Sequence, residues 1–222
     1  MRNRKNKSKL LQIYRRLYAH FGPQRWWPSE TLFEMIVGAV LTQNTAWANV
    51  EKAIHNLREK DLLDPQRIAS VNMRKLRLAI RPSGFYNEKA KRLKEVTGFL
   101  IRSCNGKIGE LRGIDKGILR RRLLEIYGIG PETADSILLY ALRKPVFVVD
   151  SYTRRLLFRH RLIGEAATYD QIQALFMDNI PRRAGLFNEY HALIVKTGKE
   201  YCRKKRGLCH ACPLLRYNGH MR

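Results

Sequence analysis

The stretch that decides the fold is Leu123-Leu-Glu-Ile-Tyr-Gly-Ile-Gly-Pro-Glu-Thr-Ala-Asp-Ser-Ile137. Two helical patterns meet there around Gly128 and Gly130, and Pro131 is placed to open the second helix, where a missing N–H costs nothing. Glycine permits a tight turn and a close approach of the backbone to a ligand. With the positive end of a helix behind them, the amides of this turn predict a phosphate site that ignores base sequence. A hairpin that only reverses the chain is the alternative.

Around this hairpin, apolar residues recur at helical spacing along most of the chain, and no run of alternating strands appears. We therefore expect an all-α protein. Val146-Phe-Val-Val149 is β-like in composition but short, so we expect an extended connector between two lobes rather than a strand. Helices are expected at about 8–20, 30–43, 46–59, 72–79, 87–103, 116–126, 131–142, 151–162, 169–179 and 184–197.

The charge balance points to a polyanionic partner. The 222 residues include 43 Lys and Arg against 19 Asp and Glu, a formal net charge of +24, which is more than solubility requires. Nucleic acid ranks first, ahead of a membrane surface or an acidic protein. No apolar stretch approaches the roughly 20 residues of a membrane span, and the basic N-terminus lacks the apolar segment of a signal peptide. We expect an intracellular, cytoplasmic and nucleoid-associated protein with no membrane contact.

A carboxylate follows the connector at the start of a basic helix, in Val148-Val-Asp150-Ser-Tyr-Thr-Arg-Arg155. Asp is a common helix N-cap, so a purely structural capping role is the alternative for Asp150. Hairpin and Asp together, however, resemble the helix-hairpin-helix, Gly/Pro-rich-loop, Asp signature of DNA glycosylases related to endonuclease III. Two further motifs occur in the family's order, Leu41-Thr-Gln43-Asn-Thr45 and Gly84-Phe-Tyr-Asn-Glu-Lys-Ala90.

The resemblance implies a two-lobed helix-hairpin-helix glycosylase fold. A six-helix barrel lobe would span 28–143 and contain the hairpin motif at about 116–142, and a second helical lobe would combine 1–27 with 144–222. The implied partner is double-stranded DNA containing a damaged base, bound by a monomer. Asp150 would be the catalytic carboxylate at the mouth of a cleft between the lobes, where it stabilises oxocarbenium character on the sugar or orients the attacking water.

Departures from the family pattern bear on the reaction. In bifunctional relatives a lysine on the second hairpin helix forms a Schiff base, but this position is Glu132, which cannot form an imine. The catalytic acid of adenine-removing relatives is also missing, because Gly38-Ala-Val40 occupies that region. The chain is most similar to endonuclease-III-like 3-methyladenine DNA glycosylases. We therefore expect a DNA repair N-glycosylase that flips and excises an alkylated purine such as 3-methyladenine, with water as nucleophile and without lyase activity.

The same resemblance implies two further sets of site residues. Aromatic rings can stack on an alkylated purine, although tryptophans are usually core residues. The expected base pocket comprises Trp26, Trp27, Pro28, Trp47 and Glu132. Gln43 would fill the gap left by the flipped base and Phe85 would act as a wedge. The expected DNA-binding set is Gln43, Phe85, Gly128, Gly130, Thr133, Lys89 and Arg92.

The cysteines near the C-terminus suggest a metal. Cys202, Cys209 and Cys212 resemble the endonuclease III cluster loop, C-x6-C-x2-C-x5-C, but its fourth position, in the loop 202–218, is Asn218. Three thiolates suit a [4Fe–4S] cluster if His220, a water or a small molecule supplies the fourth ligand. Zinc bound by three Cys and one His is the second alternative, and no metal is the third.

Two other functions compete with the monofunctional glycosylase. One is an endonuclease III-like bifunctional glycosylase and abasic-site lyase that acts on oxidised or deaminated bases. The other is a non-catalytic helix-hairpin-helix DNA-binding protein, against which Asp150 and the tryptophans argue.

Overall fold

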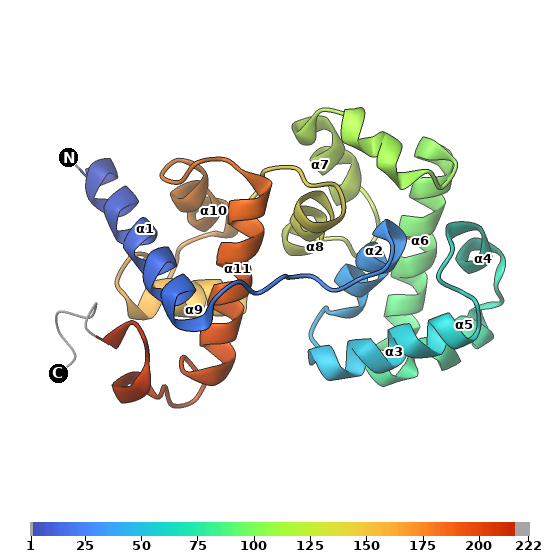
Figure 1. The fold of residues 1–222 in the computed structure, drawn as a ribbon. Helices are drawn as coiled ribbons and strands as arrows, with labels where there is room; N and C mark the ends of the chain where they lie inside the picture. The colour runs from blue at the N-terminus through green and yellow to red at the C-terminus, as the bar shows by residue number, and fades with distance from the viewer. Residues whose placement is uncertain (1, 216–222) are drawn as a thin grey trace. The chain divides into compact units, whose positions relative to one another are not determined.

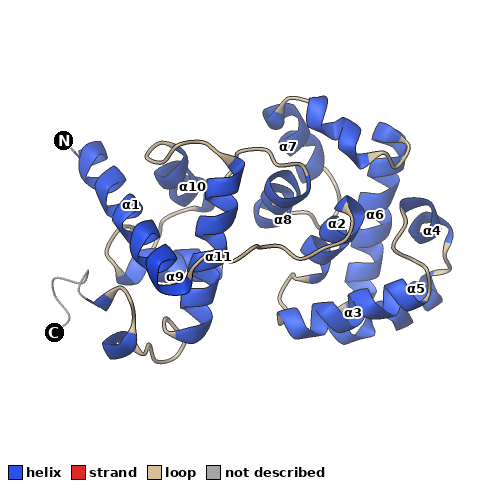
Figure 2. Cartoon of the chain, viewed as in Figure 1, coloured by secondary structure: helices blue, strands red, loops and turns tan. Residues whose placement is uncertain are grey.

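The computed structural model describes residues 2–215, and every regular element in this part of the chain is helical. No strand occurs among these residues (Figure 2). The all-α prediction is therefore confirmed, and Val146–Val149 is buried and has no regular secondary structure. No described helix is both long and apolar enough to cross a bilayer.

The chain divides into two compact units (Figure 1). One is Trp27–Lys144, and the other combines Met1–Trp26 with Pro145–Arg222. Each unit is described by itself below.

The unit Trp27–Lys144 is built around α2 (Leu32–Leu41), eight of whose ten residues are buried. Helix α2 contacts α3 (Trp47–Glu59), α6 (Tyr86–Cys104) and α8 (Pro131–Ser136). The remaining elements of this unit are α4 (Pro65–Ser70), α5 (Met73–Ile80), α7 (Lys116–Leu124) and the 3-10 turns Arg81–Ser83 and Ile108–Gly113.

Local chemistry explains where several of these helices begin. Thr31, Asp64, Asn72 and Asp115 are N-caps whose side chains accept hydrogen bonds from backbone amides of the first turn. These bonds satisfy amides that have no partner inside the helix. The first residues of α2, α4, α5 and α7 are therefore fixed by the residue that precedes each helix.

Two features of this unit differ from the sequence-based expectation. Helix α4 was not predicted, because six residues are too few for a helical period to show. The single helix expected at 131–142 is instead α8 followed by a π-helix, η3 (Ile137–Ala141). Residues 133–142 are all buried, so their burial shows no period that would distinguish an α-helix from a π-helix.

The second unit is organised by α11 (Ala184–Glu200), which packs against α1 (Arg2–Phe21) and α9 (Ser151–Arg159). Its core is aromatic, and the rings of Phe147 and Phe176 stack with centroids 3.6 Å apart. A Cβ on Gly198 of α11 would lie 2.3 Å from Tyr152 Cδ1 of α9, so this glycine permits the close approach of the two helices. The unit also contains α10 (Tyr169–Met177) and the 3-10 turn Cys209–Ala211.

Candidate functional site

Asp150 is the N-cap of α9 and has two partners. Its Oδ1 accepts a hydrogen bond of 2.7 Å from the Thr153 amide, and its Oδ2 lies 3.5 Å from Nε2 of His191 on α11. The side chains of Asp150 and His191 are 12% and 6% exposed. The cap explanation is thus correct for Oδ1 of Asp150, while Oδ2 faces the buried imidazole of His191.

The surroundings of Asp150 keep it ionised. Burial by itself would raise the pKa of Asp150, but the charge and hydrogen bonding of His191 and the Thr153 hydrogen bonds outweigh it, so the pKa is lowered. A carboxylate held in this form is a weak base. It is suited to stabilising positive charge that develops beside it.

The hairpin joins α7 to α8 in the way the sequence predicted. Gly128 has a φ of +75°, which only glycine adopts without strain. A Cβ at this position would lie 2.4 Å from Nε of Arg92, whereas nothing lies within 4 Å of a Cβ at Gly130. Below the turn, Arg120 on α7 forms an ion pair of 2.7 Å with the fully buried Asp135 on α8. The two hairpin helices are therefore joined by a partly buried ion pair, and Arg92 packs against the turn at Gly128.

The Gln43 side chain does not project into solvent but forms hydrogen bonds with the hairpin. Its Nε2 donates to the Gly128 carbonyl at 3.1 Å and to Thr133 Oγ1 at 2.8 Å, while its Oε1 accepts from the Arg92 guanidinium. Four of the expected DNA-binding residues, Gln43, Arg92, Gly128 and Thr133, thus form one network. A gap-filling role for Gln43 would require these hydrogen bonds to be exchanged when DNA binds.

Lys89 is buried and bonded inside the protein, so its place in the expected DNA-binding set is corrected here. The residue is 1% exposed, and its Nζ donates to the carbonyls of Leu41 at 2.8 Å and Ser83 at 2.6 Å. Burial, and to a smaller extent the charge of Arg92, lowers the pKa of Lys89 to about 8. Lys89 therefore joins the end of α2 to the turn before Phe85.

The Phe85 side chain is exposed and its backbone is strained. It is 71% exposed, and its φ of 46° lies in the left-handed region. An exposed aromatic side chain in this conformation gains no stability from packing, and such strain commonly occurs at functional positions. A wedge role agrees with both properties and remains a prediction.

An aromatic cluster lies beside α2 in the unit Trp27–Lys144. The Trp27 ring contacts Trp47 edge to face at 5.0 Å and Tyr140 of the π-helix at 5.3 Å. A Cβ on Gly38 would lie 3.1 Å from Trp27 Cζ2, so the absence of a side chain at Gly38 makes room for this ring. Tyr140 was missed by the sequence analysis, because its position follows from the π-helix.

The other expected pocket residues are placed as follows. Pro28 and Glu132 are exposed, with Glu132 in the first turn of α8. Trp26 is half-buried in the other unit, where Lys199 Nζ lies 5.8 Å from its ring centroid. The pocket as a whole stays a prediction.

The three cysteines share one cavity. Cys202, Cys209 and Cys212 line a space of about 290 Å³ together with residues of α9 and α11. Burial raises the pKa of the Cys212 thiol, and the two other cysteines contribute to this shift. Arg159 donates to Cys202 Sγ at 3.3 Å and to the Arg203 carbonyl at 2.9 Å, which anchors the loop.

This donor set fits a sulfur-ligated metal group only in part. Thiolates suit both a [4Fe–4S] cluster and zinc. Among residues 2–215, however, no three His, Cys, Asp or Glu side chains are arranged to hold a metal ion. Asn218 and His220, the positions considered for a fourth ligand, lie outside the described residues.

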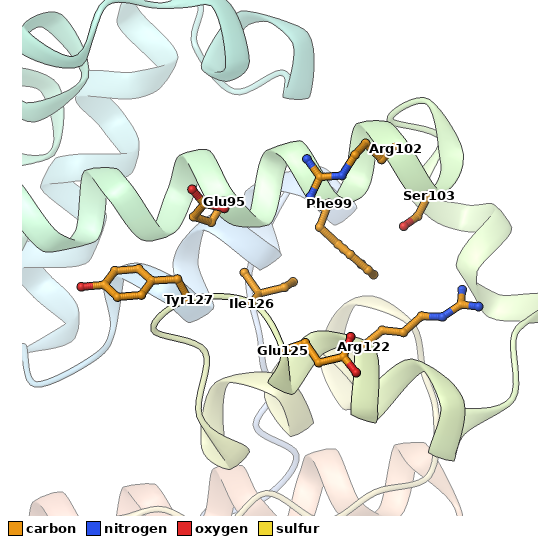
Figure 3. A pocket seen from close by; sticks show the side chains of 8 residues that line it. All are labelled: Glu95, Phe99, Arg102, Ser103, Arg122, Glu125, Ile126 and Tyr127. Atoms are coloured by element: carbon orange, nitrogen blue, oxygen red, sulfur yellow. The ribbon is translucent and has the colours of Figure 1, made fainter.

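A groove of about 500 Å³ on the unit Trp27–Lys144 contains none of the predicted site residues. Figure 3 shows the Phe99 side chain projecting from α6 toward the part of the lining that includes Arg122 and Glu125. The charged residues that line this groove are Glu95, Arg102, Arg122 and Glu125, so positive and negative side chains are balanced. A groove of mixed charge offers no preference for a polyanion.

Comparison with known proteins identifies a family, a relative and similar structures. Residues 37–182 match the model of the HhH-GPD superfamily base excision DNA repair protein. The "Putative DNA repair glycosylase MJ1434" of Methanocaldococcus jannaschii is 50% identical over 214 residues, covering 95% of this chain and 96% of that protein. The H. pylori 3-methyladenine DNA glycosylase MagIII, solved with 1,N6-ethenoadenine, is 33% identical with a TM-score of 0.72, covering 86% of this chain and 97% of that one.

The fold is also similar to that of endonuclease III in a non-covalent complex with DNA. The TM-score is 0.81 at 23% identity, with 95% of this chain and 94% of that chain covered. Together with the likeness to MagIII, this confirms the predicted helix-hairpin-helix glycosylase fold class.

Proposed function

This chain belongs to the HhH-GPD superfamily of base excision DNA repair proteins, and on that premise we propose that it is a monofunctional DNA N-glycosylase for alkylated purines. The observation that carries the proposal is the buried Asp150 carboxylate, whose pKa the Thr153 amide and His191 lower against the effect of burial. Asp150 would act on the sugar of a nucleotide that has been swung out of a duplex.

Breaking the bond between base and sugar leaves oxocarbenium character on the deoxyribose. An ionised carboxylate beside the sugar stabilises this charge in the transition state and orients a water molecule for attack. The lowered pKa of Asp150 favours electrostatic stabilisation over removal of a proton. Water is the proposed nucleophile, since the hairpin position of the lyase lysine is the exposed Glu132.

Alkylated purines are the proposed substrates for two reasons. They carry positive charge, so the base leaves without much proton donation, and electron-rich rings attract it. Trp27 and Trp47 already form an edge-to-face pair, and MagIII, to which this chain is similar, is a 3-methyladenine DNA glycosylase solved with an ethenoadenine. We propose that Trp27 and Trp47, with Trp26, Pro28 and Glu132, recognise the flipped base.

DNA binding is proposed to use the hairpin and the network around it. The backbone of Gly128 and Gly130 would bind phosphate, while Gln43 and Phe85 would occupy the space left in the duplex. A metal group bound by Cys202, Cys209 and Cys212 would be structural. It would fix the basic loop 203–206, and no step of base release passes through it.

A panel of lesion duplexes tests this proposal. The purified protein is incubated with alkylated, oxidised and deaminated duplexes, and each freed base is identified by chromatography. We expect release of 3-methyladenine or a related alkylated purine. Failure to free a base from any of these duplexes would contradict the proposed activity.

The second candidate is an endonuclease III-like bifunctional glycosylase, favoured by the likeness of fold to endonuclease III. It would act on oxidised or deaminated bases and use an amine other than the missing hairpin lysine. Borohydride reduction separates the two candidates, because only a Schiff base leaves enzyme covalently attached to abasic DNA. The monofunctional proposal predicts no trapped complex.

A further inference from the structure

The imidazole of His191 is buried within the helical core and faces the proposed catalytic carboxylate. It lies on α11 in the apolar run that continues through Ala192–Val195, and its ring centroid is 6.2 Å from that of Phe147. Its Nε2 is 3.5 Å from Asp150 Oδ2, and no sequence motif assigned it a role. Burying a polar ring in such a core costs free energy of desolvation unless the ring has a hydrogen-bond partner.

The two oxygens of Asp150 are held from different helices. The Thr153 amide of α9 binds Oδ1 at 2.7 Å, and His191 of α11 faces Oδ2. Contacts with Thr153 alone, all from α9, would leave the carboxylate free to turn about its last torsion angle, which has a broad energy well. A second contact from another helix fixes the plane of the carboxylate.

The tautomer of His191 follows from the chemistry of its neighbour. An ionised carboxylate only accepts hydrogen bonds, so a favourable contact requires the proton on Nε2 of the imidazole. At 3.5 Å the contact is long for a hydrogen bond. Catalytic hydrogen bonds are often long in free enzymes and shorten in the complex with substrate.

We propose that His191 is a positioning residue for base removal, whose Nε2–H donates to Asp150 Oδ2 and holds the carboxylate aligned with the sugar. The inference rests on the proposed role of Asp150. The inference means that catalysis requires not only the hairpin and Asp150 but also a hydrogen-bond donor on α11.

Two substitutions separate donation from packing. His191→Gln keeps an amide donor near the position of Nε2, whereas His191→Met fills similar space without a donor. On the duplex from which the wild type frees a base, His191→Met is expected to lower the single-turnover rate by about tenfold or more at unchanged DNA affinity. His191→Gln is expected to restore most of the rate. Equal rates for the wild type and His191→Met would overturn the inference.

The matched control is Tyr190→Phe. Tyr190 is the preceding residue on α11, and its hydroxyl donates to the Leu10 carbonyl at 2.8 Å, away from Asp150. The control therefore loses a buried hydrogen bond in the same helix, and the base release rate should persist. A rate as low as that of His191→Met would make the effect structural and overturn the inference.

Two measurements keep the test decisive. His191→Met should have no further effect on the rate in an Asp150→Asn background, since the interaction is then already lost. If His191→Met does not fold, nitrogen NMR of the labelled wild type at neutral pH decides, because an Nε2 without a proton would overturn the inference. Failure of the proposed function looks different, since Asp150→Asn itself would then release base at the wild-type rate.

Discussion

Lys89 shows at the scale of one residue how burial changes the meaning of a charge. On a helix rich in Lys and Arg it was expected to bind phosphate, yet its ammonium is 1% exposed and bound to two carbonyls. One of these, Leu41, precedes Gln43 by two residues, and the other, Ser83, precedes Phe85 by two. Lys89 therefore positions both segments that are proposed to enter the duplex.

Lys89→Met should destabilise the protein by about 1–3 kcal/mol above about pH 8, where the amine is neutral in the folded state, because the two carbonyls lose their buried donor. Because the pKa of Lys89 is lowered to about 8, the charged amine is penalised in the folded state below that pH. The penalty disappears as the pH rises from about 8 toward the unfolded pKa, so the stability of the wild type relative to the variant should increase across this window. Urea unfolding at several pH values measures both effects.

The control is Lys91→Met on the same helix. The Lys91 ammonium is half exposed and pairs with the exposed Glu88 at 2.8 Å, so its loss should cost about 0–1 kcal/mol. Equal destabilisation by the two substitutions would mean that the Lys89 hydrogen bonds contribute nothing.

Asp150 should stay ionised to unusually low pH. Despite burial, His191 and Thr153 lower its pKa, so its contribution to folding is present above the unfolded pKa of about 3.9 and is lost only as the pH falls through the lower folded value. We therefore expect no loss of single-turnover base release from protonation of Asp150 between about pH 7 and pH 5. A pH–rate profile measures this, and an acid limb in that interval that is absent from Asp150→Gln would contradict the expectation.

At the scale of helices, periodicity predicted most of the fold because amphipathic segments repeat over several turns. It failed at α4 and at the π-helix, where length or geometry leaves no distinct pattern. The site was predicted less completely. His191 faces Asp150 from a helix that is distant in sequence, and Tyr140 contacts Trp27 from the π-helix, so both contacts depend on tertiary packing. The spacing of the sequence motifs predicted neither contact.

The hairpin offers a test at the scale of one element. Gly128→Ala should destabilise the protein by about 1–3 kcal/mol, because the φ of +75° is strained for alanine and the Cβ would overlap the Arg92 side chain. Gly130→Ala is the matched control, since Gly130 has a φ of −90° and nothing within 4 Å of an added Cβ. Urea unfolding should show a clearly smaller effect for the control, and the reverse order would contradict the turn geometry.

At the scale of the whole molecule, the net charge of +24 governs how the protein finds DNA. Lys and Arg that neutralise phosphates release counterions, so affinity should fall steeply with salt and do so similarly for damaged and undamaged duplexes. Fluorescence anisotropy between about 50 and 200 mM salt should show at least ~10-fold weaker binding of both duplexes. Binding that is indifferent to salt would contradict an electrostatic mode of association.

The central claim is that the Asp150 carboxylate drives removal of the base. Single-turnover release from an alkylated-purine duplex tests it with the wild type, Asp150→Asn and Asp115→Asn. Asp115 is also a helix N-cap, and it accepts from the Gly117 and Ile118 amides at the start of α7. Asp150→Asn is expected to lose at least ~100-fold in rate while retaining DNA affinity, and Asp115→Asn to release the base normally. Release by Asp150→Asn at the wild-type rate would contradict the account.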